Sequence, residues 1–315
     1  MRSSTDQADT PARPGRPRFT RKRSGPLRFL APLLAVLVLL VLITESLALG
    51  SRTLSPEEVW QGLLAHDNSV ASKVVWELRI HRTVLAVVVG ASLAVAGVVM
   101  QALTRNPLAE PGILGVNAGA SLAVVAAIGG FGFTSVNQYL PFAFAGAAAA
   151  AVLVHMMSRR SADSGPARLV LAGVALGASL SSITGTITMY NSKIFDSYRF
   201  WVVGSLENRK LEVLLWVAPF LAVGLVLALA SAHSLNALAL GDEQATALGV
   251  NLAVVRGVAF VALTLLCGAA TAAAGPISFI GLVIPHVVRL LVGADQKHLL
   301  AWSVVAGAGL LLAAD

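Results

Sequence analysis

Few residues of this 315-residue sequence are of types that could carry out covalent chemistry or hold a metal ion. The single cysteine, Cys267, lies inside an apolar stretch, so the chain can form neither an internal disulfide nor a cysteine-rich metal site. His286 also lies in an apolar stretch without a carboxylate or second histidine nearby, which is more typical of a packed polar side chain than of a metal ligand. The apolar segments hold no Ser/His, paired-Asp or His-Glu-x-x-His constellation. The sequence therefore predicts no catalytic residues and no metal site.

Residues that could couple the protein to an energy source are equally scarce. Proton- and sodium-coupled transporters usually place Asp, Glu or Lys in the middle of the membrane. The centres of the apolar segments here hold essentially none, and Glu45 lies near the end of its segment. The phosphate-binding loop G-x-x-x-x-G-K-[ST] is also absent from the sequence. An ion-driven mechanism is therefore disfavoured, and we expect no cofactor in this chain: if ATP and magnesium power it, a separate ATPase subunit must bind them.

The composition indicates that helices in a lipid bilayer position these residues. Hydrophobic residues make up 56% of the sequence and charged residues only 12%, whereas a soluble domain carries about 25% charged residues. The apolar residues come in blocks near the ~20 residues that cross a bilayer as a helix. We therefore predict an all-α polytopic membrane protein with nine transmembrane segments, near residues 29–49, 83–103, 112–130, 139–157, 168–190, 211–230, 256–274, 277–292 and 299–314.

The first 28 residues differ from the rest, because they hold eight of the 23 basic residues and are rich in Pro, Ser and Thr. Such a segment buries no core and should be disordered. It could contact RNA or anionic lipid, but its simpler role is to hold the N-terminus in the cytoplasm by the positive-inside rule. With this orientation the tail and the connecting segments on the cytoplasmic side hold 15 basic residues, and the connecting segments on the outer side hold eight. We divide the chain into a disordered basic cytoplasmic tail, residues 1–28, and one transmembrane domain, residues 29–315, and we predict no nucleic-acid partner.

One apolar segment carries small residues at strict four-residue spacing, namely Gly173, Gly177, Ser181 and Gly185. Helices in lipid associate through close backbone approach, which such a stripe permits. An earlier segment repeats the pattern with Gly90, Ala94 and Gly97. In the simplest interpretation these stripes pack a helix bundle; alternatively, some of the residues line a wide pathway.

The segment from Glu77 to Ser121 combines an outer basic pair, a small-residue helix and a turn rich in helix breakers, which are Asn106-Pro107 and Pro111-Gly112. By itself this pattern predicts a helical hairpin with a structured loop. The segment strongly resembles the signature of permeases that import iron-siderophores, haem and cobalamin. The matching positions are Leu78, Arg79, Arg82, Gln101, Asn106, Pro107, Leu108, Ala109, Pro111, Gly112, Leu114 and Gly115.

Two further segments resemble the same family, Phe200 to Leu206 and Gly275 to His286, and the second runs on to Arg289 and Leu290. The three matches occur in the family's order and cover most of the chain after the tail. His81 departs from the family, which usually has proline there, so the local backbone shape at this position is in question.

The resemblance implies the permease of an ATP-binding cassette importer of the FecCD-like, type II class. In this family two permease subunits, identical or paralogous, enclose a central pathway in the bacterial inner membrane. Two cytoplasmic ATPase subunits and an external substrate-binding protein complete the importer, which moves a chelated metal by alternating access. Each permease has ten transmembrane helices. The chain shows nine and its last residue, Asp315, directly follows an apolar run, so we expect the natural protein to continue into a tenth.

The resemblance also implies a role for the segment from Leu240 to Gly249, the joint that connects two predicted spans on the cytoplasmic side. This joint should form a short surface helix that docks into the ATPase, although on sequence alone it could equally be an ordinary solvated loop. The expected contact residues are Leu240, Gly241, Asp242, Glu243, Ala245, Leu248 and Gly249.

Two other groups are expected to act at opposite sides of the membrane. Arg79 and Arg82 should meet acidic residues of the binding protein, although arginines at the end of a span also anchor it to lipid headgroups. Asn106, Pro107 and Leu108 should form part of an inner gate, or else only a helix-ending turn. A secondary transporter or channel for a bulky metal chelate is the main alternative function, and an intramembrane enzyme ranks below it.

Overall fold

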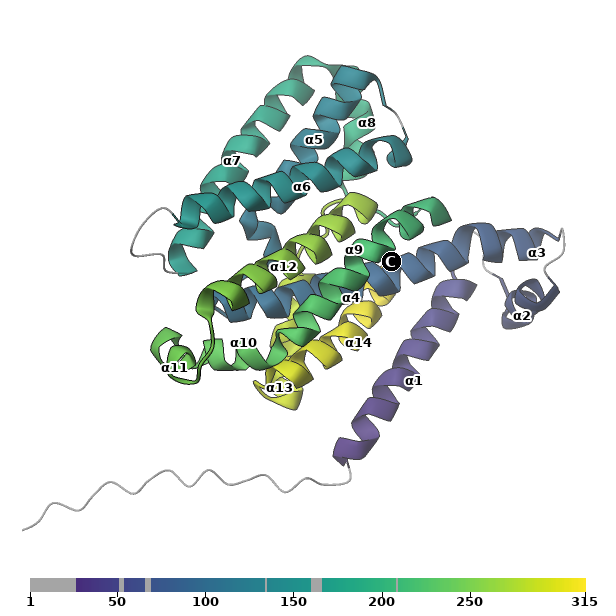
Figure 1. Cartoon of the computed structure of the whole chain (residues 1–315). Helices are drawn as coiled ribbons and strands as arrows, with labels where there is room; N and C mark the ends of the chain where they lie inside the picture. Colours follow the sequence, from purple (N-terminus) through teal and green to yellow (C-terminus); the bar gives the residue numbers. More distant parts are fainter. Residues whose placement is uncertain (1–26, 51–53, 66–68, 134, 160–165, 208) are drawn as a thin grey trace, which may run out of the picture.

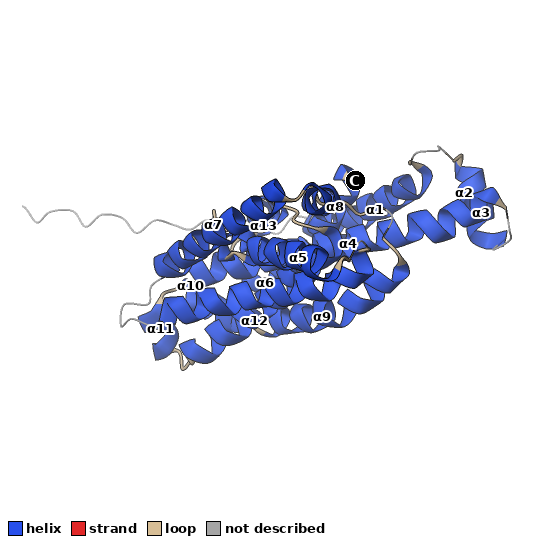
Figure 2. Cartoon of the chain, turned by 90° about the horizontal axis from the view of Figure 1, so that it is seen from above, coloured by secondary structure: helices blue, strands red, loops and turns tan. Residues whose placement is uncertain are grey.

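The computed structural model describes residues 27–50, 54–65, 69–133, 135–159, 166–207 and 209–315. Throughout these residues the regular elements are helices, which Figures 1 and 2 show packed against one another in a bundle. The all-α fold class predicted from the composition is confirmed. The predicted basic tail, residues 1–28, lies outside the described residues as far as residue 26, and helix α1 begins at Leu27.

Nine apolar helices within the described residues correspond to the nine predicted segments. Seven of them are long and apolar enough to cross a membrane, whereas α5 and α13 have only 16 and 13 residues. The nine helices are α1 Leu27–Ala48, α4 Ile80–Thr104, α5 Val116–Phe131, α6 Val136–Arg159, α7 Pro166–Tyr190, α9 Leu211–Ala230, α12 Leu252–Ala274, α13 Ile280–Val292 and α14 Gln296–Ala314.

Helices α5 and α13 are short because each begins only after a break in the chain, at Val116 and Ile280, four and three residues after the approximate starts that the sequence predicted. Before α5, Pro111–Leu114 forms the 3-10 helix η2, and Gly115 has a φ of 74°. Before α13, residues 275–278 are non-helical and Phe279 has a φ of 73°. This left-handed conformation is costly for a bulky residue, so contacts with other segments must hold Phe279 in place.

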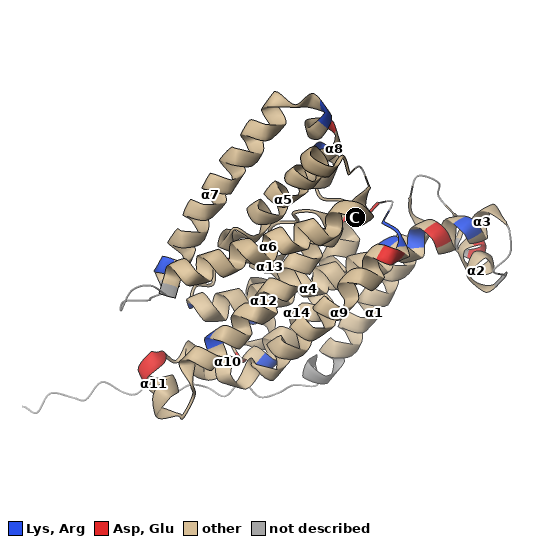
Figure 3. Ribbon diagram, turned by 45° about the horizontal axis from the view of Figure 1, so that its top comes forward, with Lys and Arg blue, Asp and Glu red and all other residues tan. Residues whose placement is uncertain are grey.

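Short helices connect the long ones and mark the two ends of the bundle (Figure 1). The α2 end carries α2, α3 and η1, and the α11 end carries α10 and α11. Figure 3 shows Lys, Arg, Asp and Glu gathered towards the helix ends, as expected for helices that cross a membrane. The connecting elements beside η2 are α2 Pro56–Ala65, α3 Val70–Lys73, the π-helix η1 Val74–Arg79, α8 Ser192–Val202, α10 Ala232–Ala239 and α11 Asp242–Ala247.

Helix α4 is the most buried of the long helices and packs against α9, α12, α13 and α14. It approaches two of them backbone to backbone. A Cβ atom on Gly90 would lie 2.3 Å from the carbonyl oxygen of Gly307 on α14, and one on Gly97 would lie 2.0 Å from that of Gly281 on α13. A Cβ on Gly307 would in turn lie 2.5 Å from that of Ala94. These contacts agree with the packing interpretation of the small residues in this helix.

Candidate functional site

The three sequence motifs, which are far apart along the chain, meet at the break between α12 and α13. From the segment after α8, the amide of Ser205 donates to the carbonyl of Ala274 at 2.8 Å. From the turn after α4, Oε1 of Glu110 accepts the amide of Phe279, also at 2.8 Å. Glu110 thus caps the start of α13 across 169 residues of sequence and satisfies an amide that the helix itself leaves without a partner. Glu110 was not among the predicted site residues, because a lone carboxylate beside a proline gives no local signal of a distant helix.

A buried polar contact joins α4 to the same region. The side chain of Gln101 is 3% exposed. Its Nε2 lies 3.4 Å from the carbonyl oxygens of Gly281 and Leu282, and its Oε1 accepts a hydrogen bond from Arg289 at 3.0 Å. Since buried polar groups are costly without partners, these bonds fix α13 against α4 in one register.

The turn that follows α4 presents an apolar side chain. Arg105 ends the helix with a φ of 51°, and the side chain of Asn106 accepts the amide of Leu108 at 2.9 Å. Leu108 is therefore held in a tight Asx turn, and its side chain is 69% exposed. This geometry fits both the gate and the turn interpretations, and the gate stays a prediction.

The joint predicted to dock the ATPase contains the helix α11, flanked by Gly241 at a φ of 112° and Gly249 at a φ of 80°. Its expected contact residues divide into two groups. Leu240 and Leu248 are 58% and 65% exposed, and Glu243 and Gly249 are also exposed.

The other members of the set are less available to a partner protein. Ala245 is fully buried and so is not available to a partner protein. Asp242 forms ion pairs with Arg105 and Arg256 of its own chain. The docking role of this joint stays a prediction, carried by its exposed members alone.

The two arginines at the α2 end differ in exposure. Arg79 is 6% exposed, and its Nη1 donates to the carbonyl oxygen of Leu47 at 2.5 Å. Arg82 pairs with Asp315 at 2.5 Å and lies 4.0 Å from a carboxylate oxygen of Glu207. Arg79 therefore holds α1 to η1. Of the two arginines only Arg82 has a partly exposed guanidinium for a docking contact, and that contact remains a prediction.

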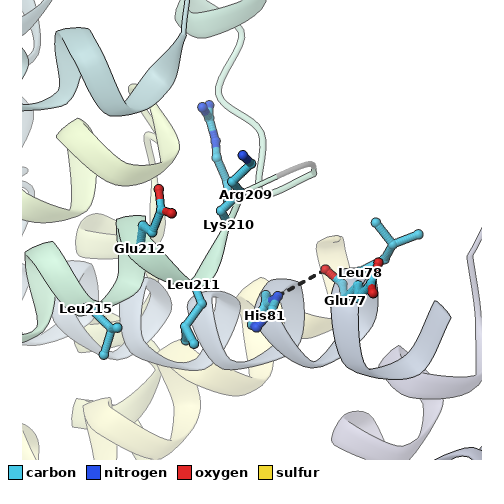
Figure 4. A pocket seen from close by; sticks show the side chains of 8 residues that line it. All are labelled: Glu77, Leu78, His81, Arg209, Lys210, Leu211, Glu212 and Leu215. Carbon is cyan, nitrogen blue, oxygen red and sulfur yellow. Dashed lines mark hydrogen bonds between the residues drawn. The ribbon is translucent and has the colours of Figure 1, made fainter. Parts of the chain in front are cut away.

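A cavity of about 610 Å³ opens beside these arginines, between the first turns of α4 and α9 (Figure 4). Cationic, anionic and apolar side chains line it together. The ring of His81 lies 3.0 Å from the carbonyl oxygen of Glu77. At this position, where the family usually has proline, the backbone is helical, since α4 follows η1 directly. The lining residues are Glu77, Leu78, His81, Arg209, Lys210, Leu211, Glu212 and Leu215. The two segments that line the cavity are far apart in the sequence, and no local pattern predicts that they meet.

The small-residue stripe on α7 is in contact only along its first half. A Cβ on Gly173 would lie 2.2 Å from the carbonyl oxygen of Ile113, whereas one on Gly177 would lie 3.7 Å from the Cα of Gly115. Further along, Ser181 is exposed, and a Cβ on Gly185 would meet no described atom within 4 Å. The first half of the stripe therefore packs against η2, and the second half is open in this chain.

Metal-binding side chains are dispersed. Within the described residues, no three His, Cys, Asp or Glu side chains lie close enough together to hold a metal ion. His286 is exposed on α13.

Comparisons with known proteins agree with this arrangement. Residues 37–315 match the model of the FecCD transport family. Over 283 residues the chain is 43% identical to the ferric enterobactin transport system permease protein of Escherichia coli (strain K12), covering 89% of this chain and 84% of that protein. It is 36% identical to the hemin transport system permease protein of Yersinia pestis, covering 93% of this chain and 87% of that protein. It is 40% identical to the vitamin B12 import system permease protein of Yersinia enterocolitica, covering 94% and 85%.

The fold is likewise similar to a solved one. A structure of a protein proposed to be a metal-chelate type ABC transporter, in an inward-facing conformation, superposes with a TM-score of 0.78 at 30% sequence identity. The match covers 90% of this chain and 88% of that one. Together with its apolar helices, these matches identify a multi-pass membrane protein. The chain belongs to the FecCD transport family.

Proposed function

We propose that this chain is the membrane-spanning permease subunit of an ATP-binding cassette importer and that it carries ferric-siderophore complexes into the cytoplasm by alternating access. The family match and relatives named for ferric enterobactin, hemin and vitamin B12 transport support this proposal. A haem or cobalamin complex is the alternative cargo. Iron arrives already chelated, so the permease needs no metal site or cofactor of its own.

The orientation follows from the positive-inside rule. The basic N-terminal tail stays in the cytoplasm of a cell whose inner membrane the chain spans. Helix α1 ends at the α2 end, where the hydroxyl groups of Ser46 and Thr83 lie 2.8 Å apart. The α2 end is therefore external, and the α11 end is cytoplasmic.

The observation that carries the proposal is the exposed apolar surface of the joint around α11. Leu240 and Leu248 are more than half exposed at the cytoplasmic end, beside the exposed carboxylate of Glu243. Exposed leucines on either side of a short helix fit a groove of a partner protein. We assign that groove to two ATPase subunits, which bind ATP and magnesium because this chain has no phosphate-binding loop.

At the external end, Arg82 and the exposed charges around the cavity face a substrate-binding protein that delivers the chelate. Two permease subunits, identical or paralogous, enclose the pathway, with the Asn106–Leu108 turn near its inner end. Charge complementarity at the external surface would set the register and rate of docking. A secondary transporter or channel is the rival function, and the near absence of charge in the middle of the spans argues against it.

The test is uptake into proteoliposomes that contain the permease, its ATPase subunits and the binding protein. We expect labelled ferric siderophore to accumulate only with ATP on the ATPase side, and haem or cobalamin not to compete. Uptake that follows a proton or sodium gradient without the ATPase would establish the rival function instead. Stronger uptake of haem or cobalamin than of ferric siderophore would change the cargo and leave the importer class intact.

A further inference from the structure

The carboxylate of Asp242 is shared by arginines from two different helices, an arrangement we call the Asp242 bridge. A single nitrogen of Arg256, Nη2, donates to both carboxylate oxygens at 2.9 and 2.7 Å. On the other side, Nη2 of Arg105 lies 3.4 Å from Oδ1. Asp242 is 40% exposed and the two arginines about one-third exposed, so water screens the bridge in part. Two cations around one carboxylate nevertheless give a directed, charge-assisted contact.

The two arginines connect the bridge to the parts of the chain that surround the proposed pathway. Arg105 is the residue that ends α4, and the Asn106–Leu108 turn follows it directly. Arg256 lies in the second turn of α12, whose far end leads to the break where the three motifs meet. The bridge thus joins α11 both to the turn and to the helix that leads to the break.

The surroundings of α11 explain why such a bridge is needed. The helix has only six residues and lies between two glycines with positive φ, Gly241 and Gly249. Glycine permits many backbone conformations, so these joints can act as hinges. Of its residues, Ala245 alone is buried. A force on the exposed side of α11 would be absorbed by the hinges unless a further contact tied the helix to the bundle.

We propose that Asp242 is a positioning residue: through the Asp242 bridge it transmits the movement of α11 to α4 and α12, and it does not itself contact the ATPase. This inference rests on the proposed function, and it changes the role that the sequence predicted for Asp242. Binding of the ATPase belongs to Leu240, Glu243 and Leu248, and transmission belongs to the bridge. Loss of binding and loss of transmission then have different signatures.

The experiment uses the complete importer in proteoliposomes, with ATPase retention on purification, ATP hydrolysis and chelate uptake measured on the same samples. Asp242→Asn keeps the shape of the side chain but removes its charge. We expect it to retain the ATPase subunits while the chelate transported per ATP falls by about fivefold, the order expected for losing one partly screened charged contact. Arg105→Gln should act in the same direction, and the double variant should be no worse than the more affected single one. Leu248→Asp should instead lose the ATPase subunits.

Two further variants serve as controls. Asp242→Glu keeps the charge and should restore most of the coupling. Asp196→Asn removes another exposed Asp–Arg pair, with Arg199 at 3.5 Å on α8, and should leave transport per ATP unchanged. A thermal midpoint for each variant separates uncoupling from misfolding.

Two results would overturn the inference. Asp242→Asn with wild-type transport per ATP would show that the bridge transmits nothing. Loss of the ATPase subunits from Asp242→Asn, as from Leu248→Asp, would make Asp242 a docking contact. Failure of the proposed function has a different signature, since the wild-type complex itself would then show no ATP-driven uptake.

Discussion

The stripe on α7 gives a matched pair of glycines whose replacement separates packing from helix propensity. A methyl group at Gly173 would lie 2.2 Å from the carbonyl oxygen of Ile113, so α7 and η2 would have to separate by roughly 1 Å to reach an ordinary contact distance. Overpacking of this kind costs about 1–3 kcal/mol. The same methyl group at Gly185 meets no described atom within 4 Å. Both changes bring the same gain in helix propensity, about 1 kcal/mol, which cancels in the comparison.

We therefore expect Gly173→Ala to unfold roughly 2–10 °C below Gly185→Ala in the same detergent. Gly177→Ala should unfold close to Gly185→Ala, because its methyl group would meet Gly115 at an ordinary contact distance of 3.7 Å. The assay is thermal unfolding of the full-length chain, followed by size-exclusion fluorescence. Replacement of Gly173 by Leu should prevent assembly of a monodisperse protein. Equal midpoints for the two alanine variants would refute the assignment of the first half of the stripe to packing.

Three other changes test contacts elsewhere in the structure. Gly97→Ala should destabilise the chain by about 1–3 kcal/mol, since its methyl group would lie 2.0 Å from Gly281; thermal unfolding against Gly185→Ala checks this. Glu110→Ala should cost about 0.5–2 kcal/mol by removing the acceptor that caps the exposed Phe279 amide, whereas Glu110→Gln, which retains an acceptor, should lose less; identical losses would contradict the cap. The Lys297 amide holds the pKa of Asp295 below its usual value. The stabilisation that the charged carboxylate of Asp295 gives is therefore present above the usual pKa range of an aspartate and is lost as the pH falls. The difference in thermal midpoint between the wild type and Asp295→Ala should therefore close in acid.

The sequence allowed the helices to be predicted because a membrane span is a local property, set by the length of an apolar run. It did not allow the breaks before α5 and α13 to be placed. Pro111-Gly112 was recognised as a helix breaker, but the residue at which a helix resumes after a break depends on distant partners. Glu110 fixes the start of α13 through Phe279, and no local pattern records that contact.

The site residues show the same limit. Arg79 and Arg82 are alike in sequence, three residues apart at the start of one span. In the structure a π-helix ends at Arg79, and that guanidinium is turned towards Leu47. The carboxylate of Asp242 and that of Glu243 were likewise assigned one role. Only the fold brings Arg105 and Arg256, from two helices, to the first of them.

The central claim, that energy enters through the cytoplasmic joint around α11, is tested most directly by a single cysteine at Leu248. The only native cysteine is Cys267, which is buried, so Leu248→Cys can be placed in a Cys267→Ala background. We predict that a short cross-linker with a maleimide at one end and an amine-reactive ester at the other links this cysteine to a lysine of the ATPase subunit in the intact importer. A membrane-impermeant maleimide added outside sealed cells should not reach it, although it should label Leu78→Cys at the α2 end. Labelling of Leu248→Cys from outside, or an absence of cross-linking to the ATPase in an active complex, would contradict the account.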